Sequence, residues 1–209
     1  MERVDQGLIE WAAAALPIPG QTQSGDVYVV EPFPNGMLVG VVDGLGHGEQ
    51  AALAANAARA VLARHAEDSV ISLVDRCHER LRSTRGVVMS LASFNAREST
   101  ITWIAIGNVA GFLLRREEGA VTTEPLLLRG GVVGDQLPRL NASIQRVTRG
   151  DVLVFATDGI QTGFADAVNL VDRPQRIADR ILARYARGND DALVLVARFT
   201  NGSDETHPG

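Results

Sequence analysis

The sequence predicts an α+β sandwich, a fold in which antiparallel β-sheets are flanked by helices. Strand patterns occur in groups joined by short turns, and two consecutive helical segments interrupt these groups. A parallel α/β fold would instead alternate strands with helices along the chain. With 209 residues, of which 45% are hydrophobic and 22% charged, the chain is long enough to bury one sizeable core. We therefore expect a single domain over residues 1–200, followed by a polar, mobile tail at 201–209.

The first strands are predicted to form a hairpin. Residues 26–31 (DVYVVE) and 37–43 (MLVGVVD) have strand composition, and the PFPNG between them supplies proline and Asn-Gly turn chemistry. Residues 49–68 are rich in alanine and contain no proline or glycine, which favours a helix. A second helix is predicted over residues 69–83, because its apolar residues recur at helical spacing.

The second half of the chain is predicted to contain further strands and one more helix. In order, the segments are strands at 86–95, 99–107 and 109–117, a Gly- and Pro-rich region at 122–143, a strand at 150–159, a helix at 173–187 and a strand at 189–199. Short turns join the first three of these strands, which favours an antiparallel meander. The Gly- and Pro-rich region is expected to fold back over the sheet.

Composition argues against several classes of function. The net charge is −5 and only 5% of residues are aromatic, whereas a nucleic-acid interface needs a basic patch with stacking side chains. All 20 basic residues are arginine, so a lysine nucleophile and a P-loop lysine are absent. No apolar run reaches the roughly 18 residues of a membrane span, and the single cysteine, Cys77, cannot form an internal disulfide. We expect a cytoplasmic protein without a nucleic-acid or membrane partner.

Acidic residues stand at the ends of several predicted strands. They are Asp26 in SGD, Asp43 in VVDG, Asp158 in ATDG and the pair Asp190-Asp191 in NDDA. A single acid of this kind is an ordinary turn residue. If the strands present all these carboxylates at the same end of the sandwich, however, their mutual repulsion requires cations. Ligands made of oxygen alone suit magnesium or manganese, so the pattern favours a divalent-metal site.

The same motifs resemble those of a known family. SGD, VVDGLGHG, TDG and DDA, in this order, resemble the metal-dependent serine/threonine protein phosphatases of the 2C type, in the bacterial branch that includes SpoIIE and RsbX. Each motif alone is weak, and the ordered set from Asp26 to about Phe199 carries the resemblance. The chain lacks an attached sensor, membrane or coiled-coil region, which favours a stand-alone, RsbX-like enzyme. The resemblance implies an αββα sandwich with two Mn²⁺ or Mg²⁺ ions at one end of the sheets.

The resemblance also implies roles for the acids. Asp43 is implied as the carboxylate that bridges both ions, and the Gly44 carbonyl as a ligand of one ion. Asp158 and Asp190 are implied as ligands of the other ion, and Asp26 as an outer acid that orients metal-bound water. The implied mechanism is in-line attack on phosphorus by a water that loses its proton between the ions.

Three further residues are candidates with competing interpretations. Asp191 is the alternative to Asp190 as a ligand. His47 is a candidate general acid, but two residues separate it from the Asp-Gly pair, so it could instead cap the next helix or hydrogen-bond its own loop. Gln21 stands where the eukaryotic enzymes hold phosphate with an arginine. Arg85 is therefore a candidate substitute, and otherwise a solvated loop residue.

The glycines of VVDGLGHG have two expected uses. At Gly44 the absence of a Cβ is expected to let the backbone approach an ion closely. Gly46 and Gly48 are expected to form a tight turn into the alanine-rich helix.

The resemblance implies a protein phosphatase in a signalling pathway. The expected substrates are phosphoserine or phosphothreonine on regulatory STAS-domain proteins, of the stressosome or anti-sigma antagonist type, so that dephosphorylation resets a stress signal. A non-catalytic, phosphatase-like module that binds a signalling partner is the alternative, although none of the implied metal-binding acids is missing. A hydrolase of small phosphorylated metabolites is a third interpretation. We expect a monomer, since the sequence presents no long exposed apolar stripe.

Overall fold

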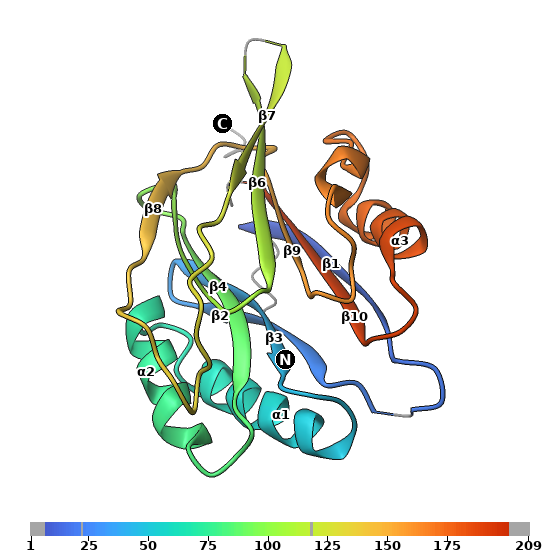
Figure 1. The fold of residues 1–209 in the computed structure, drawn as a ribbon. Coiled ribbons are helices and arrows are strands. Elements are labelled where there is room, and N and C mark those ends of the chain that lie inside the picture. The colour runs from blue at the N-terminus through green and yellow to red at the C-terminus, as the bar shows by residue number, and fades with distance from the viewer. Residues whose placement is uncertain (1–6, 22, 118, 201–209) are drawn as a thin grey trace, which may run out of the picture.

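In the computed structural model, which describes residues 7–21, 23–117 and 119–200, two antiparallel five-stranded sheets pack face to face (Figure 1). One sheet has the strand order β1 (Ile9–Leu16), β10 (Ala192–Phe199), β9 (Val152–Ala156), β6 (Ala110–Glu117) and β7 (Ala120–Pro125). The other sheet has the order β2 (Asp26–Phe33), β3 (Gly36–Gly44), β4 (Val87–Asn95), β5 (Thr100–Ile106) and β8 (Ser143–Arg146).

Helices cover the outer face of each sheet, which gives the expected αββα order of layers. Helices α1 (Glu49–Arg64) and α2 (Val70–Leu81) lie on the sheet that contains β2 to β5 (Figure 1). Helix α3 (Pro174–Tyr185) lies on the sheet that contains β1 and β10. The sequence predicts all three helices, the first from its alanine-rich composition and the other two from periodicity. Ser69 caps α2 by accepting a hydrogen bond from the Ser72 backbone N–H.

The alternation of side chains along β3 determines where the strand presents its acid. Val39 and Val41 are fully buried between the two sheets, whereas Leu38 and Val42 are fully buried against the helices. Since successive side chains of a strand point to opposite faces, Asp43 continues the series that faces the other sheet. It does so where the strand ends, so its carboxylate lies at the mouth of the layer between the sheets.

Two features of the sheets differ from the sequence prediction. Residues 86–117 do not form one meander, because β4 pairs with β5 but the chain then crosses to the other sheet, where β6 pairs with β7 and β9. Gly107 and Asn108 lie in this crossing. The sequence also gives no indication of β1, since its four consecutive alanines have neither alternation nor β-branched residues. The segment forms a strand because it pairs with β10 along its whole length.

The Gly- and Pro-rich region predicted at 122–143 begins within β7, which the sequence did not predict as a strand, and after β7 it folds back over a sheet as expected. Val133 is fully buried in the layer between the second sheet and its helices, and its backbone exchanges hydrogen bonds with Val87 of β4. The Gly134 backbone N–H donates to the Nδ1 of His78 in α2 at 3.0 Å. The region is therefore held by both the sheet and the helix.

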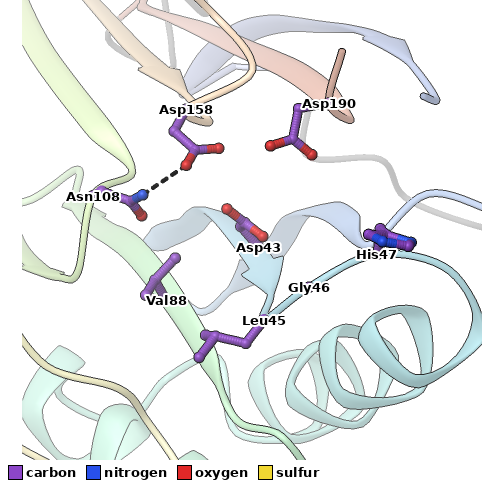
Figure 2. Close-up of a pocket in the computed structure, with 8 residues that line it drawn as sticks. All are labelled: Asp43, Leu45, Gly46, His47, Val88, Asn108, Asp158 and Asp190. Atoms are coloured by element: carbon purple, nitrogen blue, oxygen red, sulfur yellow. Dashed lines mark hydrogen bonds between the residues drawn. The ribbon is translucent and has the colours of Figure 1, made fainter. Parts of the chain in front are cut away.

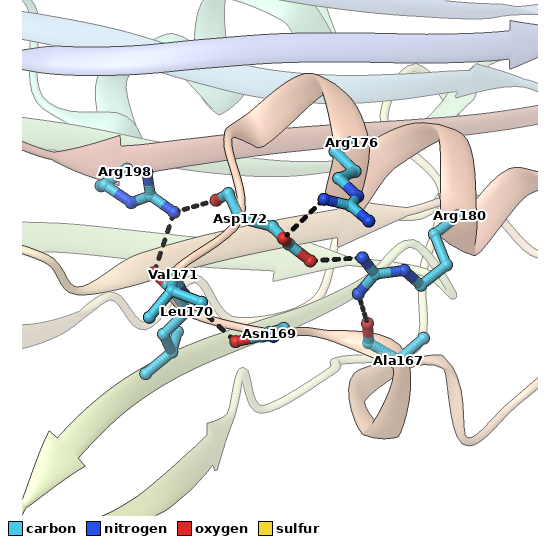
Figure 3. A network of polar contacts seen from close by, with 8 residues as sticks. All are labelled: Ala167, Asn169, Leu170, Val171, Asp172, Arg176, Arg180 and Arg198. Atoms are coloured by element: carbon cyan, nitrogen blue, oxygen red, sulfur yellow. Dashed lines mark hydrogen bonds and ion pairs between the residues drawn. The ribbon is translucent and has the colours of Figure 1, made fainter.

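A cluster of charges fixes the segment between β9 and α3, which contains the short 3-10 helix η1 (Phe164–Ala167). Asp172 forms ion pairs with Arg176 and Arg180 of α3 (Figure 3). The hydrogen bond from Arg180 holds the pKa of Asp172 below its usual value. Arg198 of β10 donates to backbone carbonyls of the same segment. These charges pair with one another or with the backbone, so we interpret the cluster as structural.

Three smaller expectations concern a thiol, a membrane span and the tail. Cys77 is fully buried in α2, with its Sγ 3.9 Å from the Ala58 carbonyl oxygen, and burial raises its pKa to about 12. A thiol held in this way is not an activated nucleophile. None of the described helices is long and apolar enough to span a membrane. The tail predicted at 201–209 lies outside the described residues.

Candidate metal centre

The acids that stand at strand ends meet at one edge of the sandwich. Strand β2 begins and β3 ends at this edge, and Asp26 is paired directly with Asp43 in the register of the two strands. In the other sheet β9 ends just before Asp158, and β10 begins just after the acidic pair. Because β9 and β10 are antiparallel, these two ends lie side by side. Figure 2 shows Asp43, Asp158 and Asp190 facing a common space from the two sheets.

These three carboxylates line one pocket. The pocket has a volume of about 230 Å³, and its other lining residues are Leu45, Gly46, His47, Val88 and Asn108. Of the predicted site residues, four therefore line the pocket, namely Asp43, His47, Asp158 and Asp190. The other four lie around it, as described below, and they are Asp26, Gly44, Arg85 and Asp191.

Asp26 lies beside Asp43 on the neighbouring strand and is almost completely buried. Its Oδ2 accepts a hydrogen bond from the Thr157 hydroxyl at 2.8 Å, and the Thr157 oxygen in turn accepts one from the Leu193 backbone N–H at 2.9 Å. Thr157 follows β9 in the opposite sheet, so this bond ties the two sheets together beside the pocket. Sequence reasoning missed Thr157, although the signal was present, since it is the first residue of the TDG motif.

The two members of the acidic pair have different partners. Asp191 is buried, and its two carboxylate oxygens accept hydrogen bonds from the backbone N–H groups of Ile18 and Gly25 at 2.8 and 2.7 Å. Both oxygens therefore hold the loop between β1 and β2. Asp190 instead faces the pocket, and its Oδ1 accepts only the N–H of Asp191, at 2.9 Å, among the described residues. The geometry favours Asp190 as the residue available to a ligand.

The glycines of the two Asp-Gly pairs allow backbones to approach each other. A Cβ on Gly44 would lie 2.2 Å from the Ala51 carbonyl oxygen of α1, and one on Gly159 would lie 1.9 Å from the Asp191 carbonyl oxygen. The contact between β3 and α1 therefore requires a glycine at position 44, and the expected approach of its backbone to an ion stays a prediction. Gly46 and Gly48 have φ angles of +88° and +75°, which confirms the tight turn expected before the helix.

Burial and mutual repulsion disfavour the charged forms of these acids. Burial, followed by repulsion from the other carboxylates, raises the pKa of Asp43 to about 8. Burial also raises the pKa of Asp26 to about 7, against the opposing hydrogen bond from Thr157. The pKa of Asp158 is raised chiefly by burial and by Asp190, and the hydrogen bond from Asn108 and the charge of Arg187 act in the opposite direction. A cluster of acids that raise one another's pKa is the electrostatic setting in which a bound cation is most stabilising.

The donors at this edge fit a hard divalent cation. The charged groups that line the pocket are carboxylates, and oxygen ligands suit Mg²⁺ or Mn²⁺ rather than zinc. Within the part of the chain that the structure describes, no three His, Cys, Asp or Glu side chains lie close enough together to hold a metal ion by themselves. Backbone oxygens and water would have to complete the coordination, as is usual for magnesium.

His47 and Arg85 lie on the same side of the pocket, near the turn before α1. The Nδ1 of His47 and the Nε2 of Gln21 are 2.9 Å apart and share a hydrogen bond, so His47 is tied to the loop before β2. The helix-cap interpretation of His47 is wrong, because Gly48 is the N-cap of α1 and no side chain caps it. Arg85 is exposed, and its Nη1 lies 2.8 Å from the point where Gly46 would carry a Cβ.

Asn108 is a pocket residue that sequence reasoning missed. Its Nδ2 donates a hydrogen bond to the Oδ2 of Asp158 at 2.8 Å (Figure 2). Asn108 lies between β5 and β6, where the chain crosses from one sheet to the other. An asparagine after glycine reads as an ordinary turn in a meander, so only the crossing shows why it reaches the acids.

The fold and site together define the class of protein. An αββα sandwich with acids gathered at one edge of its sheets is the architecture of the 2C-type phosphatases. Residues 34–200 match the family of Stage II sporulation protein E (SpoIIE), and the chain belongs to this family. It is therefore a phosphatase of the 2C type.

Individual relatives place the chain near RsbX within this class. The phosphoserine phosphatase RsbX of Bacillus subtilis (strain 168) is 25% identical over 141 residues, which cover 68% of this chain and 69% of RsbX. A chain from a structure of the bacterial stressosome is 28% identical, with a TM-score of 0.82 over 91% of this chain and 99% of that one. RsbX in complex with magnesium shares the fold at 19% identity, with a TM-score of 0.82 over 92% of this chain and 96% of that one.

Proposed function

We propose that the chain removes phosphate from phosphoserine or phosphothreonine on a STAS-domain regulatory protein and so resets a stress signal. One observation carries the catalytic part: Asp43, Asp158 and Asp190 face one pocket from two sheets, in a chain of the SpoIIE family. The substrate class is supported by similarity to the phosphoserine phosphatase RsbX and to a chain of the bacterial stressosome. We also propose that the protein acts in the cytoplasm, and that it is a monomer because its sequence presents no long exposed apolar stripe.

Each acid at the site has a proposed role. We assign Asp43, Asp158, Asp190 and the Gly44 carbonyl as the groups that would hold two Mg²⁺ or Mn²⁺ ions. When bound, such ions neutralise the phosphoryl oxygens and make a water acidic enough to attack phosphorus. We assign to Asp26, which accepts a hydrogen bond from the Thr157 hydroxyl, the role of an outer acid that would orient that water.

Arg85 is the proposed contact for the substrate phosphate. Its guanidinium lies against the backbone of Gly46, which lines the pocket, and it forms no ion pair with any described acidic residue. The pocket itself presents negative charge, so an approaching phosphate needs a cation at the rim. Gln21 occupies the place of the arginine that the eukaryotic enzymes use. Arg85 reaches the same edge from the start of β4 instead.

The Asp43→Asn variant tests the catalytic assignment. We expect it to lower the rate of phosphate release from a phosphorylated STAS protein by about 1000-fold, because a lost ligand removes several kcal/mol of charge stabilisation. Its circular dichroism spectrum should match that of the wild type. Asp75→Asn, which changes an exposed acid of α2, is the matched control and should retain activity. Full activity in Asp43→Asn would show that the ligand assignment is wrong.

The substrate class is tested separately with the unaltered protein. We expect a much higher kcat/KM for a phosphorylated STAS protein than for a phosphorylated sugar, because the proposed partner is a protein surface. Equal efficiency on the two would instead indicate a general phosphohydrolase of small metabolites.

A further inference from the structure

We propose that Asn108 is a positioning residue that orients the Asp158 carboxylate toward the metal centre. The proposal rests on the proposed function, because it requires Asp158 to be a metal ligand. Asn108 lines the same pocket, and its Nδ2 donates to the Asp158 Oδ2 at 2.8 Å (Figure 2). The two residues are 50 positions apart in the sequence, so the fold itself creates the contact.

The backbone on both sides of Asn108 is firmly held. The Gly107 N–H donates to the Arg129 carbonyl oxygen at 2.7 Å. The Val109 carbonyl oxygen accepts a hydrogen bond from the Ser90 hydroxyl at 2.7 Å, and Val109 and Ser90 are both fully buried. These hydrogen bonds fix the backbone on both sides of Asn108. A fixed backbone is what a residue needs in order to orient a metal ligand.

The bond acts on a carboxylate that no other described side chain holds by a hydrogen bond. The terminal torsion of an aspartate has broad, two-fold preferences, so burial alone does not fix its oxygens. Arg187 supports the same region, but its Nε donates to the backbone carbonyl of Asp158 at 2.8 Å, and it acts on the carboxylate through its charge alone. Among the described residues, Asn108 is the side chain that forms a hydrogen bond with that carboxylate.

A neutral amide suits this position better than a charged donor. The amide uses a lone pair of Oδ2 and leaves Oδ1 available to an ion. An arginine or lysine there would neutralise the carboxylate and compete with a cation for it. Asn108 therefore restrains Asp158 without reducing its value as a ligand.

Metal titration by calorimetry tests this role. Wild type, Asn108→Ala and Asp158→Asn are each titrated with Mn²⁺, and Asn189→Ala serves as the control because Asn189 is an exposed asparagine beside Asp190. We expect Asn108→Ala to bind Mn²⁺ about tenfold more weakly than wild type, the lower end of the usual effect of such partners, since the hydrogen bond is exposed. Saturating Mn²⁺ should restore most of the turnover of Asn108→Ala, and Asn189→Ala should match the wild type in both assays.

The outcomes separate this inference from the proposed function. If Asp158→Asn weakens Mn²⁺ binding but Asn108→Ala does not, the positioning role is wrong and the ligand assignment stands. If wild type binds no Mn²⁺, or Asp158→Asn binds it unchanged, the ligand assignment itself is wrong. A lower metal-free melting temperature in Asn108→Ala with unchanged Mn²⁺ affinity would show a merely structural role. Should Asn108→Ala fail to fold, Asn108→Ser, which is too short to reach Asp158, replaces it with the same expectation.

Discussion

The raised pKa values of Asp43 and Asp26 make the stability of the fold depend on pH. Burial raises the pKa of Asp43 to about 8 and the pKa of Asp26 to about 7, from the usual value of 3.8 for an aspartate. At a pH between the pKa of the unfolded chain and the pKa of the folded chain, the native protein binds more protons than the unfolded one. The free energy of unfolding therefore falls as the pH rises. This stabilisation is fully present at a pH below the pKa of the unfolded chain. It is lost as the pH rises through the pKa of the folded chain.

The pH dependence is measurable in the presence of a chelator. We expect the melting temperature of the metal-free protein to fall as pH is raised from about 5 to about 8, because both acids are forced to ionise in the native state. Asp43→Asn should reduce this fall, since it removes one of the two ionisations. A melting temperature that is constant or rises over this range, with no difference between the two proteins, contradicts the electrostatic picture of the site.

Arg85 gives the second prediction at the level of single residues. We expect Arg85→Ala to lower kcat/KM for the phosphorylated protein about 10- to 100-fold, because a charge-assisted contact with phosphate is worth roughly 1.5–3 kcal/mol. Its affinity for Mn²⁺ should not change. Arg97→Ala, at the opposite end of β4, is the matched control. If both variants behave alike in steady-state kinetics, Arg85 is a solvated loop residue.

At the level of elements, the acidic pair before β10 combines two tasks in adjacent residues. Asp191 joins the start of β10 to the loop between β1 and β2, and Asp190 faces the pocket. We expect Asp191→Asn to lower the free energy of unfolding by about 1.5–3 kcal/mol, because a buried charge-assisted hydrogen bond is lost. Asp190→Asn should change it by less than about 0.5 kcal/mol and yet lower phosphatase activity strongly. Urea unfolding in chelator, together with phosphate release, distinguishes the two, and the opposite order of effects would exchange their roles.

The elements that the sequence predicts are those with a local cause. Helix α2 has a clear apolar stripe and a serine cap, and β2 and β3 flank a recognisable turn. Strand β1 has no local sequence feature of this kind, because its alanines form a strand only through pairing with β10. The crossing after β5 is equally invisible locally, since the short turn fits a meander as well as a change of sheet.

The same distinction applies to the site. The acids are predictable because each one marks a strand end, and strand ends of antiparallel sheets gather at an edge. The partners of these acids depend on contacts between distant segments, such as Thr157 with Asp26, 131 positions apart, and Ile18 with Asp191, 173 positions apart. Motif spacing therefore identifies candidate ligands, and only the folded chain shows which acid is structural and which neighbour restrains a ligand.

For the whole molecule, the two sheets contribute acids to one pocket, so a bound ion would join the two halves of the sandwich. The family and its relatives establish a 2C-type phosphatase. The dependence of this chain's activity on a divalent ion is the central claim that the geometry adds. It is best tested on the unaltered protein, because no substitution then confuses stability with chemistry.

The most direct measurement is phosphate release from a phosphorylated STAS-domain protein, with Mn²⁺, with Mg²⁺ and with chelator alone. We predict release with at least one of the two ions, no release in chelator, and recovery when the ion is added back. Release that continues unchanged in chelator would contradict the metal centre. If no release occurs under any condition while calorimetry still detects metal binding, the chain would instead be a phosphatase-like module that binds a signalling partner.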